Sequence, residues 1–455
     1  MTPPKTSLFK RPVKPERILA LGFLTAILAG ALILMLPACA SGGRSIGLRA
    51  GFFTATSAVC VTGLSIIDAG LDLSTLGQAV LLVLIQLGGL GFMAFATLIM
   101  AAFGKRMSLK SRLLLRDSMN QTTLAGMVRL SLIFFLMAII IESVGALLLM
   151  VRFVPLYGAK GVWYSFFTAI SAFCNAGFDL FGSGNSLTHL VGEDYVLLVL
   201  SVLIILGGIG FSVILGCLHH RFRWRAFSLH SKIVLAATAG LLLAGTLLTL
   251  ALEWNNPATL GNLSAWDKLV NSFFQSVTLR TAGFAGIDQA SLTDSTKLIG
   301  IPFMFIGASS ASTGGGVKTT TMAMLLLVVI NVSRGRERIS AFGREISADT
   351  ARRAITIVLI GLVMVLGSAC VISSIEASKG LNMLDLLFET TSAFSTTGLS
   401  SVGTANLSAA SQWLLMPLMY LGRVGPLTLA FALASRGEQH PAVRVRYPEE
   451  KIMIG

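Results

Sequence analysis

The sequence predicts an all-α integral membrane protein in which eight spanning helices form four similar repeats around one axis. Two properties of the whole chain and one recurring pattern lead to this fold class. The 455 residues are 54% hydrophobic and only 12% charged, and the mean hydropathy is +0.80; such values lie far outside the range of soluble domains. A short loop that ends in glycine recurs four times, which indicates an internal repeat.

Each repeat is expected to contain two spanning helices with a shorter segment between them. Spans reach or approach the roughly 20 residues that cross the hydrocarbon layer, and we expect them at 18–36, 76–102, 130–151, 196–218, 233–252, 298–332, 354–375 and 413–434. The intervening semi-apolar segments are too short to span, as re-entrant half-helices are; they lie at 49–59, 161–173, 266–278 and 383–394.

Each half-helix runs into a loop of four residues, and these loops are candidates for an ion filter. They are Cys60-Val61-Thr62-Gly63, Cys174-Asn175-Ala176-Gly177, Arg280-Thr281-Ala282-Gly283 and Ser395-Thr396-Thr397-Gly398. The preceding runs at 56–59, 170–173, 275–278 and 391–394 are also alike. Glycine adopts unusual backbone angles without a Cβ clash, and a ring of backbone carbonyls can replace the water around a potassium ion. The side-chain oxygens of Thr62, Asn175, Thr281 and Thr397 either join this ring or pack behind it.

The second spanning helix of each repeat carries a further glycine motif. Its copies are Gly88-Gly89, Gly207-Gly208, Gly307-Ala308 and Gly422-Arg423, and close helix packing explains any single copy. The third copy continues as a run of small and hydroxyl residues, which breaks a helix. We therefore expect an intramembrane gate at 307–318, formed by Gly307, Ser309, Ser310, Ser312, Thr313, Gly314, Gly315, Gly316 and Lys318, with Arg423 beside it.

Charged residues near the filter suggest electrostatic roles. Asp68, Asp179 and Asp288 follow three of the loops; they either concentrate cations at an outer mouth or simply face water. Intramembrane ionisable groups usually pair, so Glu389 is expected to neutralise Arg280, whereas Glu142 has no evident partner. Lys318 and Arg423 either raise the barrier to a cation below the filter or cap helix ends.

The charge distribution gives an orientation and excludes other classes of protein. Although the formal net charge is +14, Lys and Arg cluster in every second loop, which is the positive-inside pattern and not a nucleic-acid surface. Both termini are then cytoplasmic, and membrane lipids account for the remaining charge. An enzyme is not expected, because the five histidines lie in or near loops and form no catalytic set. Nucleotide binding at 307–318 would need glycine where Val317 stands.

At this level of detail the chain resembles the Trk/Ktr/HKT superfamily of potassium transporters. Eight spans and the tail at 447–455 point to the Ktr branch. The resemblance implies potassium uptake across the cytoplasmic membrane, with Gly63, Gly177, Gly283 and Gly398 lining the filter, residues 307–318 as the gate and Arg423 beneath it. It also implies a homodimer on a cytoplasmic nucleotide-binding ring of RCK-type subunits, and some members of the superfamily are stimulated by sodium. No nucleotide is expected on this chain, because its cytoplasmic loops are short and basic. Potassium, held by filter carbonyls, is the expected metal.

The expected domain limits follow the repeats. Pore repeats are expected at 17–104, 105–220, 221–340 and 341–435. They lie between a cytoplasmic N-terminus at 1–16 and a cytoplasmic tail at 436–455, whose apolar end at 452–454 is expected to insert at a subunit interface.

Overall fold

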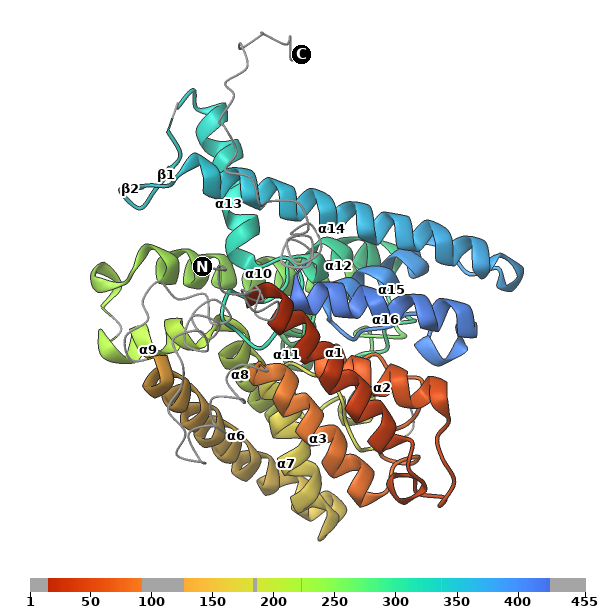
Figure 1. Ribbon diagram of the computed structural model, residues 1–455. Coiled ribbons are helices and arrows are strands. Elements are labelled where there is room, and N and C mark those ends of the chain that lie inside the picture. Colours follow the sequence, from red (N-terminus) through yellow and green to blue (C-terminus); the bar gives the residue numbers. More distant parts are fainter. Residues whose placement is uncertain (1–14, 92–126, 183–185, 222, 337, 426–455) are drawn as a thin grey trace, which may run out of the picture.

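The structure is a computed structural model that describes residues 15–91, 127–182, 186–221, 223–336 and 338–425. Within these ranges the chain is almost wholly helical (Figure 1). A short hairpin of β1 (Ser340–Ala341) and β2 (Arg344–Glu345) is the one sheet that this part of the chain contains. Residues 1–14 of the expected N-terminal segment, most of the basic loop after the second expected span, and the expected tail at 436–455 lie outside the described residues.

The helices fall into four groups in chain order. The first group is α1 (Pro15–Leu34), α2 (Leu48–Cys60) and α3 (Thr75–Leu90); the second is α6 (Met127–Tyr157), α7 (Lys160–Phe173), α8 (Asp194–Ile209) and α9 (Phe211–His219). The third is α10 (Leu229–Glu253), α11 (Ala265–Thr278), α12 (Asp294–Phe305) and α13 (Thr319–Ser333); the fourth is α14 (Ala348–Ile375), α15 (Met383–Ser395) and α16 (Ala409–Val424). In each group a long helix packs on a short one, and the short helix lies where a half-helix was expected.

Contacts between the groups close a circle. The helix that follows each short helix packs against the short helix of the next group: α3 on α7, α8 on α11, α12 on α15, and α16 on α2. Figure 1 shows the four groups around a common centre, with the first and fourth groups adjacent although they lie at opposite ends of the sequence. The loops after α2, α7, α11 and α15 are thereby brought together.

The helix starts follow local sequence rules. Ser74, Thr293 and Ser408 precede α3, α12 and α16, and each side chain accepts a hydrogen bond from a backbone N–H of the first turn. Such caps satisfy donors that the start of a helix leaves unpaired.

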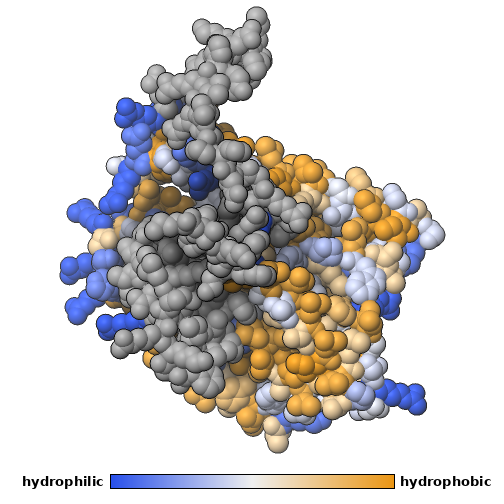
Figure 2. All heavy atoms as spheres, in the orientation of Figure 1, coloured by the Kyte–Doolittle hydropathy of each residue, from blue (hydrophilic) through white to orange (hydrophobic). Residues whose placement is uncertain are grey.

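Four described helices, α1, α6, α10 and α14, are long and apolar enough to cross a membrane, and α8 with α9 would form a fifth span if counted together. Their outer faces carry exposed large apolar residues, including Leu32, Leu147, Leu243 and Val363. Figure 2 shows hydrophobic residues over much of the visible face and hydrophilic ones gathered at the edge that carries the hairpin. Large exposed apolar surfaces are expected where lipid is the solvent.

Two of the expected spans are not continuous helices. The segment at 196–218 was expected to be one span, but the chain bends by 97° between α8 and α9. The bend lies at Gly210, whose φ of +99° is outside the helical region, and the Phe211 amide bonds to the Ala311 carbonyl, 3.1 Å away. The segment at 298–332 is broken between α12 and α13, as its glycines predict. The ends of the expected spans at 76–102 and 413–434 lie outside the described residues.

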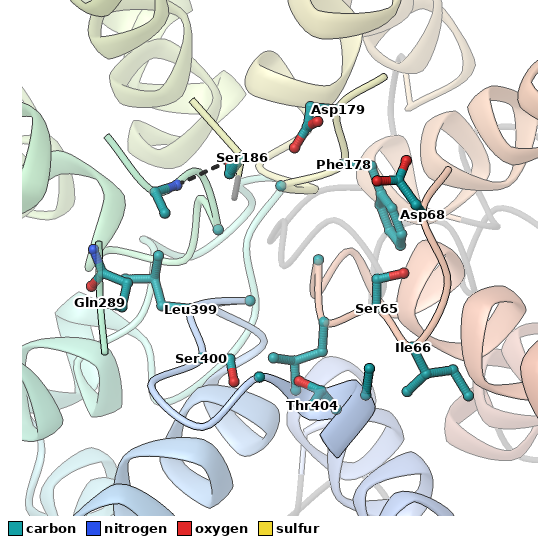
Figure 3. Close-up of a pocket in the computed structure, with 18 of the residues that line it drawn as sticks. Ser65, Ile66, Asp68, Phe178, Asp179, Ser186, Gln289, Leu399, Ser400 and Thr404 are labelled. Carbon is teal, nitrogen blue, oxygen red and sulfur yellow. Dashed lines mark hydrogen bonds between the residues drawn. The ribbon is translucent and has the colours of Figure 1, made fainter. Parts of the chain in front are cut away.

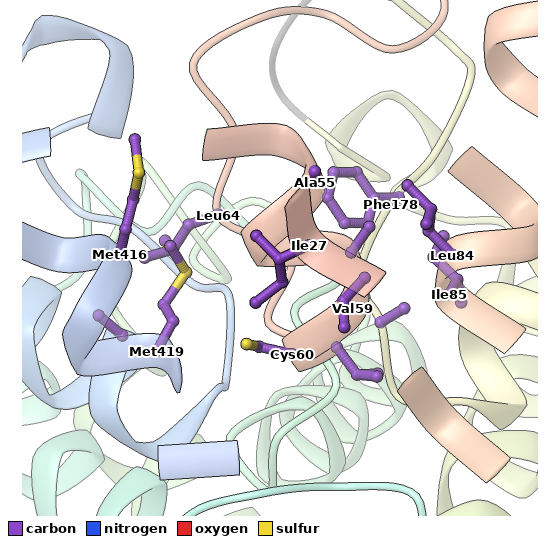
Figure 4. Close-up of a cluster of buried hydrophobic side chains, with 14 of the residues drawn as sticks. Ile27, Ala55, Val59, Cys60, Leu64, Leu84, Ile85, Phe178, Met416 and Met419 are labelled. Carbon is purple, nitrogen blue, oxygen red and sulfur yellow. The ribbon is translucent and has the colours of Figure 1, made fainter. Parts of the chain in front are cut away.

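The largest buried cluster joins the first and fourth groups. Figure 4 shows Ile27 of α1, Val59 of α2 and Ile85 of α3 facing Met416 and Met419 of α16. All five side chains are at least nine-tenths buried. This packing lies directly behind the first of the four loops and holds it in place.

Candidate functional site

The four glycine loops form one closed ring of backbone. A Cβ added to Gly63 would lie 2.7 Å from the Ala176 carbonyl oxygen, one on Gly177 2.9 Å from that of Ala282, and one on Gly283 2.7 Å from that of Thr397. A Cβ on Gly398 would meet the Thr62 carbonyl oxygen, which completes the circle. Any other residue at these four positions would therefore push against the carbonyl of a neighbouring loop.

The backbone conformation repeats in all four loops. Each glycine has a positive φ, between +69° and +94°. The residue two positions earlier also has a positive φ: +56° at Val61, +58° at Asn175, +62° at Thr281 and +54° at Thr396. Non-glycine residues rarely adopt this region. This second position of positive φ could not be predicted from the sequence, because its residue type differs among the loops.

Serines near the ends of three short helices brace the loops. Ser57 and Ser392 accept hydrogen bonds from the Gly63 and Gly398 amides at 3.1 and 3.0 Å, and Ser171 accepts one from the Phe178 amide at 3.0 Å. These three serines stand six residues before their glycines. They belong to the similar runs that precede the loops, so the sequence pattern already pointed to them. Ser276 stands seven residues before Gly283 and donates instead to the Leu242 carbonyl at 2.9 Å. At the third loop, Thr278 Oγ1 instead donates to the Phe284 carbonyl at 2.7 Å.

The second glycine motif packs against the ends of the short helices. A Cβ on Gly88, Gly207 or Gly422 would collide with the carbonyl oxygen of Val59, Phe173 or Phe394, respectively. Each of these carbonyls lies four residues before its loop glycine. The motif thus lets α3, α8 and α16 approach the carbonyl ends of the short helices, whose partial negative charge favours a nearby cation. Close packing therefore accounts for these three copies of the motif.

The polar side chains of the loops mostly face away from the carbonyl ring. Thr281 and Thr396 lie against Gly314 and Gly315 below the ring, and Thr397 Oγ1 bonds to Ser395 Oγ at 2.8 Å. Asn175 packs behind the second loop against Gly207 of α8. The Thr62 hydroxyl is buried and has no hydrogen-bond partner among the described residues. For Asn175 and Thr397 the geometry favours packing behind the loops.

The break between α12 and α13 folds back beneath the loops. The Gly307 amide bonds to the Val317 carbonyl at 2.8 Å, which closes the neck of this segment. Its backbone reaches α8 through Ser309 and Thr313, whose amides bond to the Gly208 and Gly207 carbonyls at 3.0 and 3.2 Å. It reaches α16 through the Gly316 amide, 3.3 Å from the Gly422 carbonyl. The expected gate residues are therefore together, directly under the ring.

Three cationic side chains surround this segment. Arg423 donates to the Thr313 carbonyl and, from its other nitrogen, to the Gly88 carbonyl. Lys318 donates to the Gly314 carbonyl at 2.7 Å. Arg280 donates to Thr319 Oγ1 at 3.3 Å. Arg423 contacts the broken segment and α3 together, so it does more than cap α16.

Two expectations about acidic partners need revision. No ion pair joins Arg280 to Glu389 in the described part of the chain, so that predicted pair is wrong. Glu389 instead accepts a hydrogen bond from Thr404 Oγ1 at 2.5 Å. Glu142 of α6 does have a partner: Gln86 Nε2 donates to both of its oxygens, at 3.1 and 3.0 Å. The Cys174 thiol donates to Gln86 Oε1 at 3.2 Å, so this network reaches the second loop.

A cavity of about 560 Å³ opens on the other side of the ring (Figure 3). All four loop glycines line it, together with Asp68, Asp72, Asp179 and Asp288. The three predicted aspartates are thus brought to one vestibule, and Asp72, which binds the Asp68 amide at 2.8 Å, was missed. Burial, with a smaller contribution from the charge of Asp68, raises the pKa of Asp179 to about 6.

The donors that the loops offer are backbone carbonyl oxygens. Within the described residues, no group of three His, Cys, Asp or Glu could hold a transition metal. In ion filters, backbone carbonyls of this kind can replace the hydration shell of an alkali cation. The fold and the site together define a polytopic membrane protein with a narrow carbonyl ring between a carboxylate-lined vestibule and an intramembrane loop.

Comparison with known proteins supplies the family. Residues 32–440 match the TrkH family, described as cation transport protein. The chain belongs to this family.

Relatives cover almost the entire chain. The chain is 40% identical to the Ktr system potassium uptake protein B of Bacillus subtilis, over 97% of both sequences. It is 38% identical to the potassium/sodium uptake protein NtpJ of Enterococcus hirae, over 100% of both. The crystal structure of the potassium transporter TrkH from Vibrio parahaemolyticus has the same fold, with a TM-score of 0.70, 18% identity, and coverage of 95% of this chain and 86% of that one. The expected membership in the Ktr branch is confirmed.

Proposed function

We propose that this protein takes up potassium across the cytoplasmic membrane, through a filter formed by its four glycine loops. The closed ring of Gly63, Gly177, Gly283 and Gly398 is the observation that carries the proposal. Each loop has two positive φ angles, at the glycine and two residues before it. This shared backbone conformation is expected if all four loops present their carbonyls in the same way. The names of the relatives, which describe uptake of potassium or of potassium and sodium, support the choice of ion.

The proposal includes eight spans in four repeats around one pore. The circular packing of the four helix groups supports it. The exposed Arg221, Arg223, Arg334 and Arg336 lie at the ends of α9 and α13, and basic residues there favour a cytoplasmic location for that side. The filter and its vestibule would then face outward, and both termini would be cytoplasmic.

The broken segment at 307–318 is proposed as the gate. It lies under the ring and is held by backbone hydrogen bonds to α8 and α16, and Lys318 and Arg423 add positive charge where a cation would leave the filter. A cation passing this point would meet both the segment and these charges. Displacement of the segment would open the path.

Regulation is proposed to come from another polypeptide. The relative from Bacillus subtilis is named as protein B of a Ktr system, which supports a homodimer docked on a cytoplasmic RCK-type nucleotide-binding ring. The name of NtpJ supports a role for sodium. The tail at 436–455, which we expect at a subunit interface, lies outside the described residues.

The direct test is growth. Cells that lack their own potassium uptake systems should grow in low potassium when they produce this protein. A variant with Gly63 and Gly283 both replaced by serine, produced in equal amount, should not restore growth. Failure of the unaltered protein to restore growth, in the presence of a matching regulatory subunit, would contradict the proposed function.

A further inference from the structure

We propose that Gln275 and Gln289 are positioning residues for the third glycine loop, and that their mutual hydrogen bonds set the preference of this loop for potassium over sodium. Gln275 belongs to the short helix α11, and Gln289 lies on the vestibule wall (Figure 3). The inference rests on the proposed filter and deepens it, because it assigns part of the ion preference to two side chains outside the four loops.

The two side-chain amides form a closed, reciprocal pair. Gln275 Nε2 donates to Gln289 Oε1 at 2.8 Å, and Gln289 Nε2 donates back to Gln275 Oε1 at 3.1 Å. Gln289 Nε2 also donates to the Ile287 carbonyl at 2.7 Å, which fixes the orientation of its amide, because a flipped amide would turn its oxygen toward that carbonyl. Only 1% of Gln275 and 3% of Gln289 is exposed. Buried amides that satisfy each other hold two segments of chain in one arrangement.

The pair bridges the third loop from the helix that enters it to the segment that leaves it. Gln275 stands eight residues before Gly283, and Gln289 stands six residues after it. Within the same stretch, Thr278 Oγ1 of α11 donates to the Phe284 carbonyl at 2.7 Å. Both ties start on α11, so this helix, the loop and the segment up to Gln289 form one braced unit.

The first and fourth repeats hold the corresponding segment from a different helix. In the first repeat, Gln78 of α3 donates to the Ala69 carbonyl at 3.4 Å. In the fourth, Gln412 of α16 donates to the Thr404 carbonyl at 3.1 Å. Ala69 and Thr404 stand six residues after their loop glycines, as Gln289 does. The same position is thus held by a side-chain amide in all three repeats, but in the third repeat that amide comes from the short helix before the loop.

The helix that follows the third loop is committed elsewhere. Lys297 of α12 takes the place of Gln78 and Gln412, four residues after the cap of its helix. Its Nζ donates to Asp385 of α15 at 2.9 Å. The same helix runs into the broken segment at 307–318, which we propose as the gate. Because the amide pair ties the vestibule segment to α11 and not to α12, the third loop keeps its position when the gate segment moves.

The position of this loop matters because Gly283 meets all three of the other loops. A Cβ there would lie 2.7 Å from the Thr397 carbonyl oxygen and 3.3 Å from that of Thr62. It would also lie 2.9 Å from Gly177 Cα. Functional geometries must be held to within about 0.5 Å by their supporting contacts, and ion preference in a carbonyl filter depends on the arrangement of its oxygens. A shift of the third loop therefore disturbs the ring on three sides.

The test measures competition of potassium and sodium against rubidium uptake in proteoliposomes that contain the purified full chain. Gln275→Leu removes both reciprocal hydrogen bonds and leaves the buried Gln289 oxygen without its donor. We expect half-maximal competition to need about tenfold more potassium in this variant, with little change for sodium, so that the preference between the two ions falls. The maximal rubidium rate per folded protein should be nearly unchanged, as it is when only binding is weakened.

Two further variants separate positioning from stability. Asn271→Leu is the matched control, because this buried amide lies one turn earlier on α11 and donates to the Asp267 carbonyl of its own helix at 2.9 Å; it should leave the ion preference unchanged. The double variant Gln275→Leu/Gln289→Leu removes both amides, so neither is left unpaired, and its thermal unfolding midpoint should return toward that of the unaltered protein. Its ion preference should remain altered, because the tie across the loop is still missing.

Three results would overturn the proposal. They are an unchanged ion preference in Gln275→Leu, an equal loss of preference in Asn271→Leu, and a preference that recovers together with the thermal midpoint in the double variant. The last result would mean that the pair acts through stability alone. If Gln275→Leu does not fold, the double variant is compared directly with Asn271→Leu. Absence of rubidium uptake by the unaltered protein would contradict the proposed function itself, whereas uptake with unchanged preference in the variants would contradict this inference alone.

Discussion

The guanidinium of Arg423 donates a hydrogen bond to the backbone carbonyl of Thr313, across the gap between α16 and the broken segment after α12. The same side chain also reaches the Gly88 carbonyl of α3. One residue of the fourth repeat thus fixes the segment of the third repeat against a helix of the first. Because the segment has few bulky side chains, such backbone contacts are what hold it under the ring.

Loss of this contact should loosen the gate. Arg423→Ala removes both hydrogen bonds and the positive charge, so rubidium flux into proteoliposomes without any regulatory subunit should rise about tenfold, equivalent to ~1.4 kcal/mol of lost closing energy. Arg423→Lys keeps the positive charge but cannot donate to both carbonyls as the guanidinium does. Its rubidium flux should lie between those of the unaltered protein and Arg423→Ala. Flux that stays at the level of the unaltered protein would show that Arg423 does not hold the gate closed.

Deletion of residues 309–316 should have a larger effect of the same sign. The deletion removes the hydrogen bonds to Gly207, Gly208 and Gly422 and the backbone that covers the ring from below. Rubidium flux in the absence of a partner should exceed that of Arg423→Ala. Reduced flux in protein that remains folded and dimeric by light scattering would identify the segment as a structural hinge.

In the buried network at the second loop, the effects of substitutions at Gln86 and Glu142 on protein stability should be strongly coupled. Gln86→Leu leaves the Glu142 carboxylate with only the 3.8 Å hydrogen bond from the Cys174 thiol, at a cost of about 1–3 kcal/mol for a buried polar group that loses its main partner. Glu142→Leu should lower the free energy of unfolding by a similar amount. The double variant should lose less than the sum of the two single losses, by at least about 0.5 kcal/mol. Thermal unfolding midpoints of the four proteins measure this coupling. Additive effects would mean that the two residues act independently.

Uptake should depend on external pH through Asp179. Its carboxyl has a raised pKa of about 6, so it is charged at pH 7 and becomes neutral as the pH falls through 6. At low potassium, uptake should therefore fall over this interval, because the vestibule loses negative charge. Asp179→Asn should be slow at both pH values and lose the step. Asp288→Asn, the control, should be slower but retain it. A step that persists in Asp179→Asn would assign it to another group.

Much of this architecture could be predicted from the sequence, because its signals are local. Helix length, the break after Gly307 and the four glycine loops each follow from residues close in sequence. The repeated motifs suggested that the four loops form a ring, but its closure could not be derived from the sequence. The closure depends on packing between distant segments, such as that of Gly422 against the Phe394 carbonyl.

Predictions that relied on pairing across space were less successful. Arg280 and Glu389 were matched by charge, yet the structure pairs each with a hydroxyl, Thr319 and Thr404, which have no distinctive sequence pattern. The bend at Gly210 was missed because the segment at 196–218 is uniformly apolar, and its cause, contact with Ala311, lies about a hundred residues away.

The most direct test of the filter is the discrimination between potassium and sodium by Gly283→Ser. A Cβ here would lie 2.7 Å from the Thr397 carbonyl oxygen and 3.3 Å from that of Thr62, so the carbonyl ring must distort. Gly240→Ser is the matched control, because a Cβ at Gly240 of the same repeat has nothing within 4 Å. Competition of potassium and sodium against rubidium uptake should show about tenfold weaker potassium affinity and less rejection of sodium in Gly283→Ser alone. Unchanged affinity and ion preference in well-folded Gly283→Ser would contradict the filter.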